Sequence, residues 1–558
     1  MSSRVYTALK IFLRQVTGNY FRNIHVAGIE NMPMEGPTIL CCNHSNQFMD
    51  GMLIISQCPR PLSFCFAASS FNKPIVGYLA KKINVIPVYR AEDSKIQGKG
   101  NLIMTSDTDI QGFNTKFISD VKNNKNFNLG IHALLIQKKY KLIVEKVIDE
   151  EHIKVRSDPK VYENLKKGDK CNFYFIPKID NSLMFRETCH KLKEGKAICI
   201  FPEGTSHDRT HLLQLKPGVA YIALEAMANH GVKNIKLLSC GFSYFSRDQF
   251  RSDLVLEFGI PFEIPESFGE TFKVNKRQAI DLVLKIVETQ MKSVILTAPT
   301  YKEYMFIKML CNLYIPSNVE LPAEKSTDLA RRISYIYNQV RDSHKAKQIK
   351  IKVMKYMDPL EKLGIEDSDL KEKVHLEYNL LLLKFIFSFF LLIVNFLFTS
   401  LMLPLALFVE KIGEKERQKA LEKNPNKLEG KDVVSSVKVV TFVKYLPFVG
   451  IFWLFLCYYV INKWLDMKFT LLSIFFIGCI TFMIYGYISI NIIDSLRYLY
   501  ESMKTTFYYF VVPKGIDNLK VMREKLVDEV NDFFDESIKD TQYENNRIIN
   551  SPKKLLNL

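Results

Sequence analysis

Three long runs without a charged residue, all between residues 379 and 493, constrain the fold of this chain most. Residues 385–409 and 469–493 each contain 25 consecutive uncharged positions, and residues 445–461 contain 17. A helix needs about 20 apolar residues to cross the hydrocarbon core of a bilayer. The two longer runs exceed ordinary core helices, so we expect at least two membrane spans in the region 379–493. The middle run is short, and its assignment stays open.

The charges between these runs indicate a membrane topology. The segment 410–444, which we expect to be a loop, carries nine Lys/Arg and six Asp/Glu, and this favours a cytosolic side. A cytosolic N-terminal part fits if 385–409 is re-entrant or a kinked hairpin, with Asn395 and Pro404 as break points. Residues 445–461 and 469–493 would then form a hairpin with a lumenal turn. Three simple spans are the alternative.

Length and charge indicate several domains and anionic partners. The chain has 558 residues, too many for one core, and a formal net charge of +17. A basic chain favours a membrane surface, nucleic acid or phosphorylated substrates. Because the basic residues are scattered and form no block, we expect no nucleic-acid partner. The remaining candidates are a lipid bilayer and anionic small molecules.

The cysteines point to a reducing compartment. There are eleven of them, and several, including Cys41, Cys42 and Cys199, lie inside apolar runs. No C-x-x-C pair occurs. We therefore expect free thiols and no disulfide framework.

The N-terminal residues 1–23 have the pattern of an amphipathic helix. Val5, Leu9, Phe12, Leu13 and Val16 follow helical spacing, with basic residues nearby. No long apolar core and no small-residue cleavage site occur, so we expect no secretory signal. The helix would lie in a membrane interface or pack on the following domain, and the sequence leaves both open.

Residues 24–265 have the pattern of an α/β domain interrupted by an insertion. Apolar strand candidates alternate with helical stretches over 24–92 and 181–265, which favours a mainly parallel sheet flanked by helices. Residues 93–180 are polar, with short alternating runs, and indicate an inserted small β module. The chain then reads as helical over 266–378. The tail 494–558 is polar, with a helix expected to about 540 and disorder beyond.

A histidine and an aspartate lie close together after the apolar run PTILCC. His44 follows this run, and Asp50 comes six positions later. Binding residues collect where the strands of an α/β sheet end, and histidine is well suited to take a proton near neutral pH. Asp50 could accept the other ring N–H and fix the tautomer. Six positions on a straight helix rotate about 240°, so the chain must bend in the turn-forming stretch NHSN. Alone, the pair also fits an ordinary turn.

A second polar turn, FPEGTSHDRT (201–210), follows the apolar strand KAICI. The backbone N–H groups of the Pro-Glu-Gly turn, Thr205, Arg209 and, further on, Lys216 make an anion-binding neighbourhood. Arg90, at the end of the strand candidate INVIPVYR, could add a bidentate phosphate contact. An ordinary surface salt bridge is the alternative for Arg90.

A metal site is a rival interpretation of these residues. The donors would be His44, Asp50, His207, Asp208 and His211. His207 and His211 have the i, i+4 spacing of helical metal ligands. However, EGTSHDRT is a poor helix start and no glutamate lies between the two histidines. We therefore expect no metal.

Four stretches, in this order, resemble the four sequence blocks of the PlsC-like glycerophosphate acyltransferase family. They are NHSNQFMDG, the strand ending in Arg90, IFPEGTSHDR with LKPGVAYIAL after it, and LLSCGFSYF with FRSDLVLEFGIPF. The chain is most similar to the fungal-type glycerol-3-phosphate/dihydroxyacetone-phosphate acyltransferases. That branch has a comparable insertion and a segment similar to EKERQKALEKNPNKLEGKDVVSSVK. The resemblance covers roughly residues 20–535. It implies a PlsC-like sheet flanked by helices, an inserted β module and C-terminal transmembrane helices.

The resemblance implies acyl transfer from acyl-CoA to the 1-hydroxyl of glycerol 3-phosphate, and of dihydroxyacetone phosphate as well. The product would be lysophosphatidic acid, and acyl-CoA is a co-substrate, with no cofactor or metal implied. His44 would be the general base and Asp50 would orient it. The implied substrate-binding residues are Glu203, Gly204 and Thr205 for the glycerol phosphate, Arg90 for its phosphate, and Arg209 and Lys216 as further phosphate ligands.

Two departures from the commoner family pattern qualify this reading. The dyad is spaced His-x5-Asp where His-x4-Asp is commoner, and the fungal-type branch looks like this chain. Ser206 stands where many relatives that acylate lysophosphatidic acid have arginine, which favours the first acylation step.

Three alternative functions remain: a non-catalytic lipid-binding scaffold, a lysophosphatidic acid acyltransferase and a metal-dependent phosphoesterase. The family also implies a multi-pass endoplasmic reticulum protein with a cytosolic catalytic domain. The sequence indicates no oligomeric state.

Overall fold

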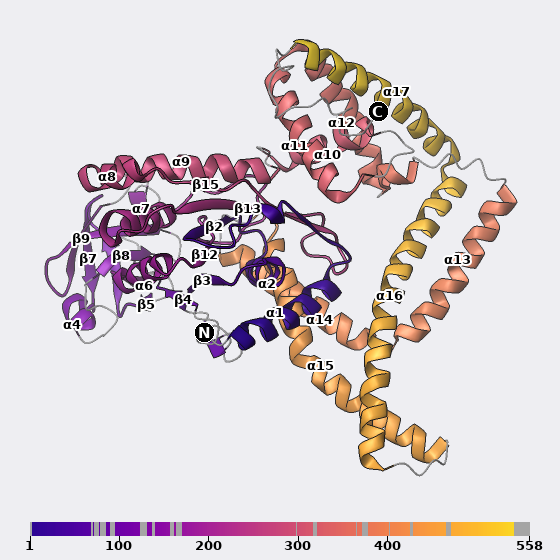
Figure 1. The fold of residues 1–558 in the computed structure, drawn as a ribbon, viewed down its shortest axis with the longest axis horizontal. Helices are drawn as coiled ribbons and strands as arrows, with labels where there is room; N and C mark the ends of the chain where they lie inside the picture. The colour runs from indigo at the N-terminus through magenta and orange to yellow at the C-terminus, as the bar shows by residue number, and fades with distance from the viewer. Residues whose placement is uncertain are drawn as a thin grey trace.

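The computed structural model contains an α/β domain, a separate antiparallel sheet, a helical bundle and a set of long apolar helices (Figure 1). It describes residues 3–540, except for 69–70, 72–76, 79–84, 90–94, 123–130, 137–139, 157–160, 163–169, 297, 299, 316–320, 364, 371–377, 401, 424–427 and 465–469. All statements below refer to the described residues.

The α/β domain is built on an eight-stranded, mainly parallel sheet, as the strand pattern predicts. The strands are β1 (Ile24–Ala27), β2 (Thr38–Cys42), β3 (Leu62–Ala67), β4 (Ile86–Val88), β12 (Ala197–Ile200), β13 (Lys236–Tyr244), β14 (Leu254–Phe258) and β15 (Phe262–Glu263). Their order is β1-β14-β13-β2-β12-β3-β4, with β15 beside β13. The pairs of β13 with β14 and with β15 are antiparallel, and the other pairs are parallel.

Helices cover both faces of this sheet. One face carries α1 (Ser3–Tyr20) and α2 (Gln47–Gln57), and the other carries α6 (Ser182–Lys193), α7 (Gly218–His230), α8 (Glu266–Val274) and α9 (Lys276–Val294). Successive residues of a strand point to opposite faces. Leu40 and Cys42 of β2 accordingly join the α1/α2 core, and Ile39 and Cys41 join the other.

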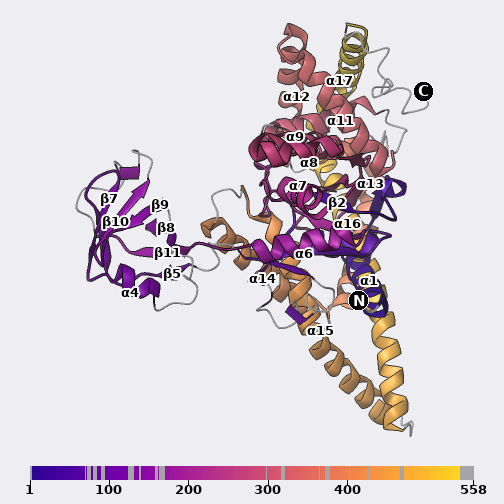
Figure 2. The same ribbon diagram turned by 60° about the vertical axis from the view of Figure 1, so that its left-hand side comes forward.

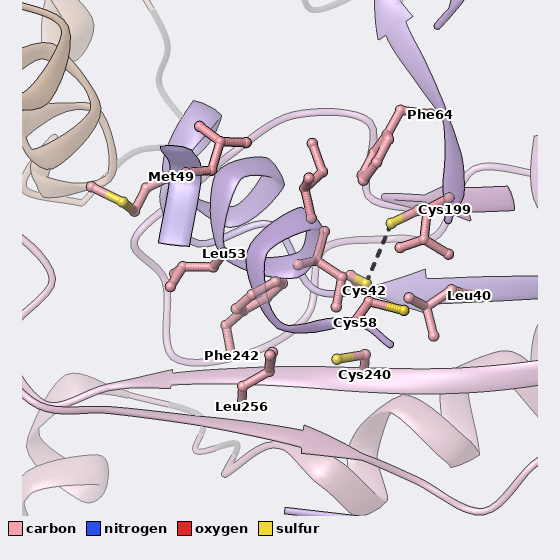
Figure 3. Packing of buried hydrophobic residues seen from close by; sticks show 14 of the residues in the cluster. Leu40, Cys42, Met49, Leu53, Cys58, Phe64, Cys199, Cys240, Phe242 and Leu256 are labelled. Atoms are coloured by element: carbon pink, nitrogen blue, oxygen red, sulfur yellow. Dashed lines mark hydrogen bonds between the residues drawn. The ribbon is translucent and has the colours of Figure 1, made fainter. Parts of the chain in front are cut away.

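Four thiols pack within the core on the α1/α2 side. Figure 3 shows Cys42, Cys58, Cys199 and Cys240 among Leu40, Leu53 and Leu256, with the Cys42 and Cys199 sulfurs 3.7 Å apart. All the described cysteines are free. Burial raises the pKa of these four thiols, to about 11 for Cys58. They therefore stay protonated and act as small apolar packing groups.

The N-terminal helix α1 packs on the domain with one face and leaves the other exposed. Tyr6, Leu9 and Leu13 are buried in the α1/α2 core. Ile11 and Phe12 are 59% and 50% exposed. One face of α1 therefore packs on the α/β domain, which was one of the two expectations for this helix. The opposite face exposes apolar side chains.

The inserted module is a seven-stranded antiparallel sheet that stands apart from the α/β domain (Figure 2). Its strands are β5 (Ile96–Gln97), β6 (Asn101–Met104), β7 (Asp109–Phe113), β8 (Ile131–Ile136), β9 (Tyr140–Val147), β10 (His152–Arg156) and β11 (Phe173–Pro177), with the short helix α4 (Phe117–Lys122). It has its own core, in which Phe117 packs edge-on against Phe173 and Phe175.

A helical bundle joins two distant parts of the sequence. Helices α10 (Tyr301–Tyr314), α11 (Ala323–Val340) and α12 (His344–Leu363) share one core with α17 (Pro513–Asp540). The expected division into a helical region 266–378 and a separate tail therefore needs correction. Residues 276–294 pack on the sheet, and 513–540 belong to the bundle. Residues 541–558, where disorder was expected, lie outside the described residues.

The apolar helices also differ in part from the sequence prediction. They are α13 (Tyr378–Thr399), α14 (Leu403–Lys423), α15 (Val434–Tyr459) and α16 (Leu471–Val511). The run 385–409 breaks after Thr399, with Pro404 in the first turn of α14, where proline is tolerated. Asn395 lies inside α13 and is not a break.

The expected loop 410–444 is largely helical. Good helix formers and the i, i+3 pairs Glu414–Arg417 and Glu416–Lys419 support α14 through Lys423. The short apolar run 445–461, whose assignment was left open, forms the C-terminal part of α15. This helix is long because it already begins at Val434.

Two of the described helical segments are long and apolar enough to cross a membrane, 431–463 and 471–497. Only 6% and 17% of their apolar windows are buried. Core helices of a soluble protein would be mostly buried, so these exposed segments indicate membrane association. They run side by side and project beyond the α/β domain (Figure 1).

Candidate active site

The parallel register of the sheet brings both polar turns to the same edge. Cys41 of β2 lies opposite Ile200 of β12, and Cys42 lies opposite Cys240 of β13. The carboxyl ends of these strands therefore meet. His44 follows β2 by two residues and Glu203 follows β12 by three. The two polar turns therefore lie next to each other at this edge, where backbone and side-chain hydrogen bonds join them.

His44 and Asp50 are in direct contact. The Nδ1 atom of His44 lies 2.9 Å from Oδ2 of Asp50. His44 is 18% exposed and Asp50 is fully buried. The chain bends before α2, as the spacing requires, and the same Oδ2 accepts the backbone N–H groups of Ser45 and Asn46. Asp50 therefore fixes both the turn and the imidazole.

A buried tyrosine holds the other oxygen of Asp50. The Tyr244 hydroxyl, at the end of β13, donates to Oδ1 of Asp50 at 2.5 Å. Burial, and then the charge of Asp50, raises the pKa of Tyr244 well above its ordinary value. The phenol therefore remains protonated and donates to Asp50. The Phe201 ring stacks on the His44 ring, with centroids 4.3 Å apart.

Glu203 joins the two turns through its carboxylate. Its Oε1 accepts the backbone N–H of His44 at 2.9 Å, and its Oε2 accepts that of Leu213 at 2.9 Å. The His207 ring also bonds to Oε2, and the His207 N–H donates to the His44 carbonyl. The Glu203 side chain is fully buried. Its oxygens are thus committed to the protein, whereas the resemblance implied contact with substrate.

The other predicted binding residues occupy different positions. Gly204 has φ +74° and a Cβ there would lie 3.3 Å from Lys216 Cγ, so Lys216 flanks the turn. Lys216 is exposed and Thr205 is partly buried. Arg209 lines a cavity beside the turn. Arg90 lies outside the described residues.

A segment that the sequence analysis did not single out as functional completes the site. Asp208 accepts the backbone N–H groups of Leu428, Glu429 and Lys431 at 2.6, 2.7 and 3.2 Å. The Ser206 hydroxyl donates to Asp432 at 2.6 Å. Residues 428–436 form what we call the docking segment, which leads from the region after α14 into α15. The sequence analysis placed it within a segment that carries the family resemblance, but its contacts with the two turns are seen only in the tertiary structure.

The docking segment also reaches the histidine turn. The Ser436 hydroxyl donates to the Asn46 carbonyl at 3.0 Å and accepts the Met49 N–H at 3.0 Å. The Tyr20 hydroxyl donates to Ser435 at 2.8 Å. All these groups are buried. The N-terminal end of the first candidate membrane span is therefore hydrogen-bonded to both polar turns.

A cavity of about 230 Å³ lies beside the turns. Its walls come from the turns (Asn43, Ser45, Glu203, His207, Arg209), the loop after β13 (Arg247, Asp248), helix α10 (Tyr304, Lys308) and the docking segment (Glu429, Lys431). Lys308 and Arg247 are basic residues that the sequence analysis missed. Their place in the sequence, far from both turns, gave no signal.

The arrangement does not favour the metal interpretation. No group of three or more potential metal ligands occurs among the described residues. His207 is bonded to Glu203, and Asp208 to the docking segment. Asp50 accepts backbone N–H groups and the His44 ring. The dyad, by contrast, has the contacts of a general base and its orienting carboxylate.

Two family models match this chain. A model named Acyltransferase matches residues 23–107 and 169–243, and one named Glycerol-3-phosphate acyltransferase 2 C-terminal domain matches residues 306–538. The first match includes both polar turns, and the gap between its two parts lies within the inserted sheet. The second spans the bundle, the apolar helices and the docking segment.

Similar proteins occur in two yeasts. An uncharacterized acyltransferase of Schizosaccharomyces pombe is 28% identical, over 92% of this chain and 78% of its own length. Glycerol-3-phosphate O-acyltransferase 1 of Saccharomyces cerevisiae is 27% identical, over 96% and 72%. Glycerol-3-phosphate O-acyltransferase 2 of the same yeast is 28% identical, over 91% and 73%.

Among solved structures, the 1-acyl-sn-glycerophosphate acyltransferase PlsC of Thermotoga maritima aligns with a TM-score of 0.27 at 15% identity. The alignment covers 52% of this chain and 83% of that protein. The fold class stands on the sheet itself and on the acyltransferase model. The two family models cover the part with the polar turns and the C-terminal part, and the yeast relatives align over more than nine-tenths of the chain. The chain therefore carries an acyltransferase domain and a glycerol-3-phosphate acyltransferase 2 C-terminal domain, and it is a homologue of the yeast glycerol-3-phosphate O-acyltransferases.

Proposed function

We propose that this protein transfers a fatty acyl group from acyl-CoA to the 1-hydroxyl of glycerol 3-phosphate, giving lysophosphatidic acid, and that it also accepts dihydroxyacetone phosphate. The names of the two Saccharomyces relatives support the reaction and the acceptor. The observation that carries the proposal is the contact of 2.9 Å between His44 Nδ1 and Asp50 Oδ2 at the joined turns. It supplies a base where an acceptor hydroxyl needs one.

In this mechanism His44 moves a proton in each direction. With Nδ1–H donated to Asp50, the Nε2 atom is an acceptor. It takes the proton of the acceptor hydroxyl while the oxygen attacks the thioester carbonyl, and Asp50 stabilises the imidazolium. When the C–S bond breaks, the coenzyme A thiolate leaves and takes the proton back. General base catalysis of this kind contributes about 10²–10⁴-fold in rate.

The substrate contacts belong to the residues around the turns. Gly204 and Thr205 shape the position of the glycerol phosphate, while Glu203 holds the turn in place. Arg90, Arg209 and Lys216 are the phosphate ligands. The basic character of these three side chains supports that role, since guanidinium and ammonium groups pair with phosphate.

We propose that the protein lies in the endoplasmic reticulum membrane as a multi-pass protein, with its catalytic domain in the cytosol. Two exposed apolar helices support membrane attachment. The free thiols and the basic segment 410–444 support the cytosolic side. Protease treatment of sealed microsomes tests the orientation, because a cytosolic catalytic domain is digested without detergent.

The activity is tested with radiolabelled acceptors in membranes that carry wild type or His44→Ala. Glycerol 3-phosphate, dihydroxyacetone phosphate and lysophosphatidic acid are compared side by side, at equal protein level. We expect transfer to the first two that falls to background in the variant. If wild type transfers nothing to any acceptor, or if His44→Ala stays fully active, the proposal fails. Transfer to lysophosphatidic acid alone would identify a second-step acyltransferase.

A further inference from the structure

We propose that the cavity beside the two turns binds a phosphomonoester group of a substrate, and that Lys308 and Arg247 bind it together with Arg209, which lines the same cavity. The inference rests on the proposed function and adds two residues outside the sequence motifs. Both substrates of the proposed reaction carry phosphomonoesters, the acceptor on its glycerol and the donor on the 3′-position of coenzyme A. The chemistry of the site is the same for either.

The cavity is lined by parts of the chain that are far apart in sequence. Arg247 comes from the loop after β13, Lys308 from α10 of the bundle and Lys431 from the docking segment. Asn43, Ser45 and Glu203 of the catalytic turns line the same space. A volume of about 230 Å³ exceeds the share of several water molecules, each about 30 Å³ in the liquid. A phosphate group therefore fits beside the two polar turns.

The acidic side chains on the walls are mostly engaged by the protein. Glu203 accepts from His44, His207 and Leu213, and Asp208 accepts three backbone N–H groups. Glu429 pairs with Lys431 at 2.5 Å. Asp248 is the remaining acidic side chain of the lining. Three of the four carboxylates are thus engaged by the protein, and no ion pair joins Lys308 or Arg247 to any of the four in the described part of the chain.

Lys308 is held in place without an ion pair in the described part of the chain. Its ammonium lies 5.3 Å from the ring centroids of both Phe245 and Tyr304, which also line the cavity. Cation–π contacts of this kind attract an ammonium but leave its hydrogen-bond donors available. Lys308 is thus a positioned cation with its donors unused by carboxylates.

Arg247 presents a second set of donors. One of its terminal nitrogens donates to the His207 carbonyl at 3.2 Å, and no carboxylate of the described residues lies within ion-pair distance. A guanidinium has five N–H donors, so most of them remain for a ligand. The fork geometry of arginine suits phosphate oxygens. Since His207 is bonded to Glu203, an anion on Arg247 lies next to the catalytic turn.

Kinetics of Lys308→Gln test the proposal, because this side chain bonds to neither turn. Loss of a charge-assisted hydrogen bond should raise the KM of one substrate by roughly ten-fold or more. Lys308→Arg should restore much of it, and Arg247→Gln should raise the same KM. Lys302→Gln is the matched control, since Lys302 is exposed on the same helix and lies outside the cavity.

A comparison of two acyl donors, acyl-CoA and acyl-dephospho-CoA, shows which substrate carries the bound phosphomonoester. If the cavity holds the 3′-phosphate of coenzyme A, the effect of Lys308→Gln disappears with an acyl-dephospho-CoA donor. If it holds the acceptor, the KM of glycerol 3-phosphate rises with either donor. The proposal is overturned if Lys308→Gln and Arg247→Gln change neither KM more than Lys302→Gln does.

A binding measurement separates this proposal from the proposed function. Calorimetric titration of His44→Ala protein with glycerol 3-phosphate and with coenzyme A needs no turnover. Weaker binding of one ligand after Lys308→Gln is added supports the anion site even if no acyl transfer is found. Equal binding with and without Lys308→Gln overturns the site even if the transferase activity is real.

Discussion

At the scale of single residues, the hydrogen bonds of the buried Asp50 carboxyl group are the feature on which the site depends. Its two oxygens accept from His44, Ser45, Asn46 and Tyr244. A fully buried carboxylate is stable only when its hydrogen bonds are made. The sequence predicted the first of these partners from the His-x5-Asp spacing. It could not predict Tyr244, which is nearly 200 positions away and is brought to Asp50 by the pairing of β13 with β2.

We predict that Tyr244→Phe lowers kcat about ten-fold or more, the equivalent of losing one hydrogen bond to a charged group. Without that donor Asp50 can shift, and His44 is held less firmly for the proton transfer, so kcat should fall more than KM rises. Steady-state acyl transfer with both substrates varied measures this.

Tyr314→Phe is the control for this prediction. Tyr314 is also a buried tyrosine, but its hydroxyl has no hydrogen-bond partner among the described residues. Its removal should leave kcat at the wild-type level. Equal activity of Tyr244→Phe and Tyr314→Phe would contradict the role of Tyr244 as a positioning residue.

At the scale of elements, the docking segment ties the catalytic turns to the first candidate span. The bond between Ser206 and Asp432 is buried at both ends, and α15 begins two residues later. We predict that Ser206→Ala and Asp432→Asn each reduce kcat, and that the double variant is little worse than either. The effects of two substitutions that each break the same hydrogen bond do not add. Strictly additive losses would show that the two act separately. Glu416→Gln, in an exposed pair with Lys419, is the control.

The charge of Asp208 should make the hold on this segment depend on pH. Burial alone would raise the pKa of Asp208, but the three N–H groups of the docking segment outweigh it and lower the pKa. Stability from a lowered carboxyl pKa is present above the unfolded value, about 3.9. It is lost as the pH falls through the lower folded value.

Hydrogen exchange of the amides of Leu428, Glu429 and Lys431 measures this dependence. Protection should persist from neutral pH to about pH 4 and fall below it. In Asp208→Asn the protection should be weak even at neutral pH. Protection that is unchanged in the variant would exclude Asp208 as the group that holds the segment.

The elements themselves were predicted well where the pattern is local. The strands of the sheet, the inserted module and both turns follow from alternating runs and turn residues. Segment 410–444 was misjudged because its charges suggested a loop, whereas its helix formers and i, i+3 pairs produce α14. The contacts of Asp208 with Leu428 and of Ser206 with Asp432 could not be predicted, since they join residues 220 and 226 positions apart, and the contact of Lys308 with Phe245 likewise joins two separate elements.

At the scale of the whole molecule, the chain returns to the bundle after the apolar helices. The long helix α16 runs from the far end of the apolar region to α17, which packs on α10, α11 and α12 (Figure 1). The bundle also supplies Lys308 to the cavity beside the catalytic turns. Its stability should therefore matter for the site, although no residue of the dyad belongs to it.

A buried ion pair fastens α17 to the rest of the bundle. Arg523 donates to both oxygens of Asp367, at 2.9 and 3.2 Å, and the Tyr356 hydroxyl donates to the same carboxylate at 2.7 Å. The two charged side chains are only 4% and 1% exposed. Removal of one partner leaves a buried charge uncompensated, which costs about 3–5 kcal/mol. An exposed pair contributes about 1 kcal/mol or less.

We therefore predict that Arg523→Met destabilises the bundle strongly and that Lys345→Met does not. Lys345 of α12 pairs with Glu536 of α17, the helix that also carries Arg523, but the side chains of Lys345 and Glu536 are 67% and 54% exposed. Thermal unfolding of the detergent-extracted protein compares the two variants. Asp367→Leu combined with Arg523→Met should recover part of the loss, because no charge then remains buried. If Arg523→Met melts at the same temperature as Lys345→Met, the buried pair does not hold α17, and the apolar core of the bundle alone does.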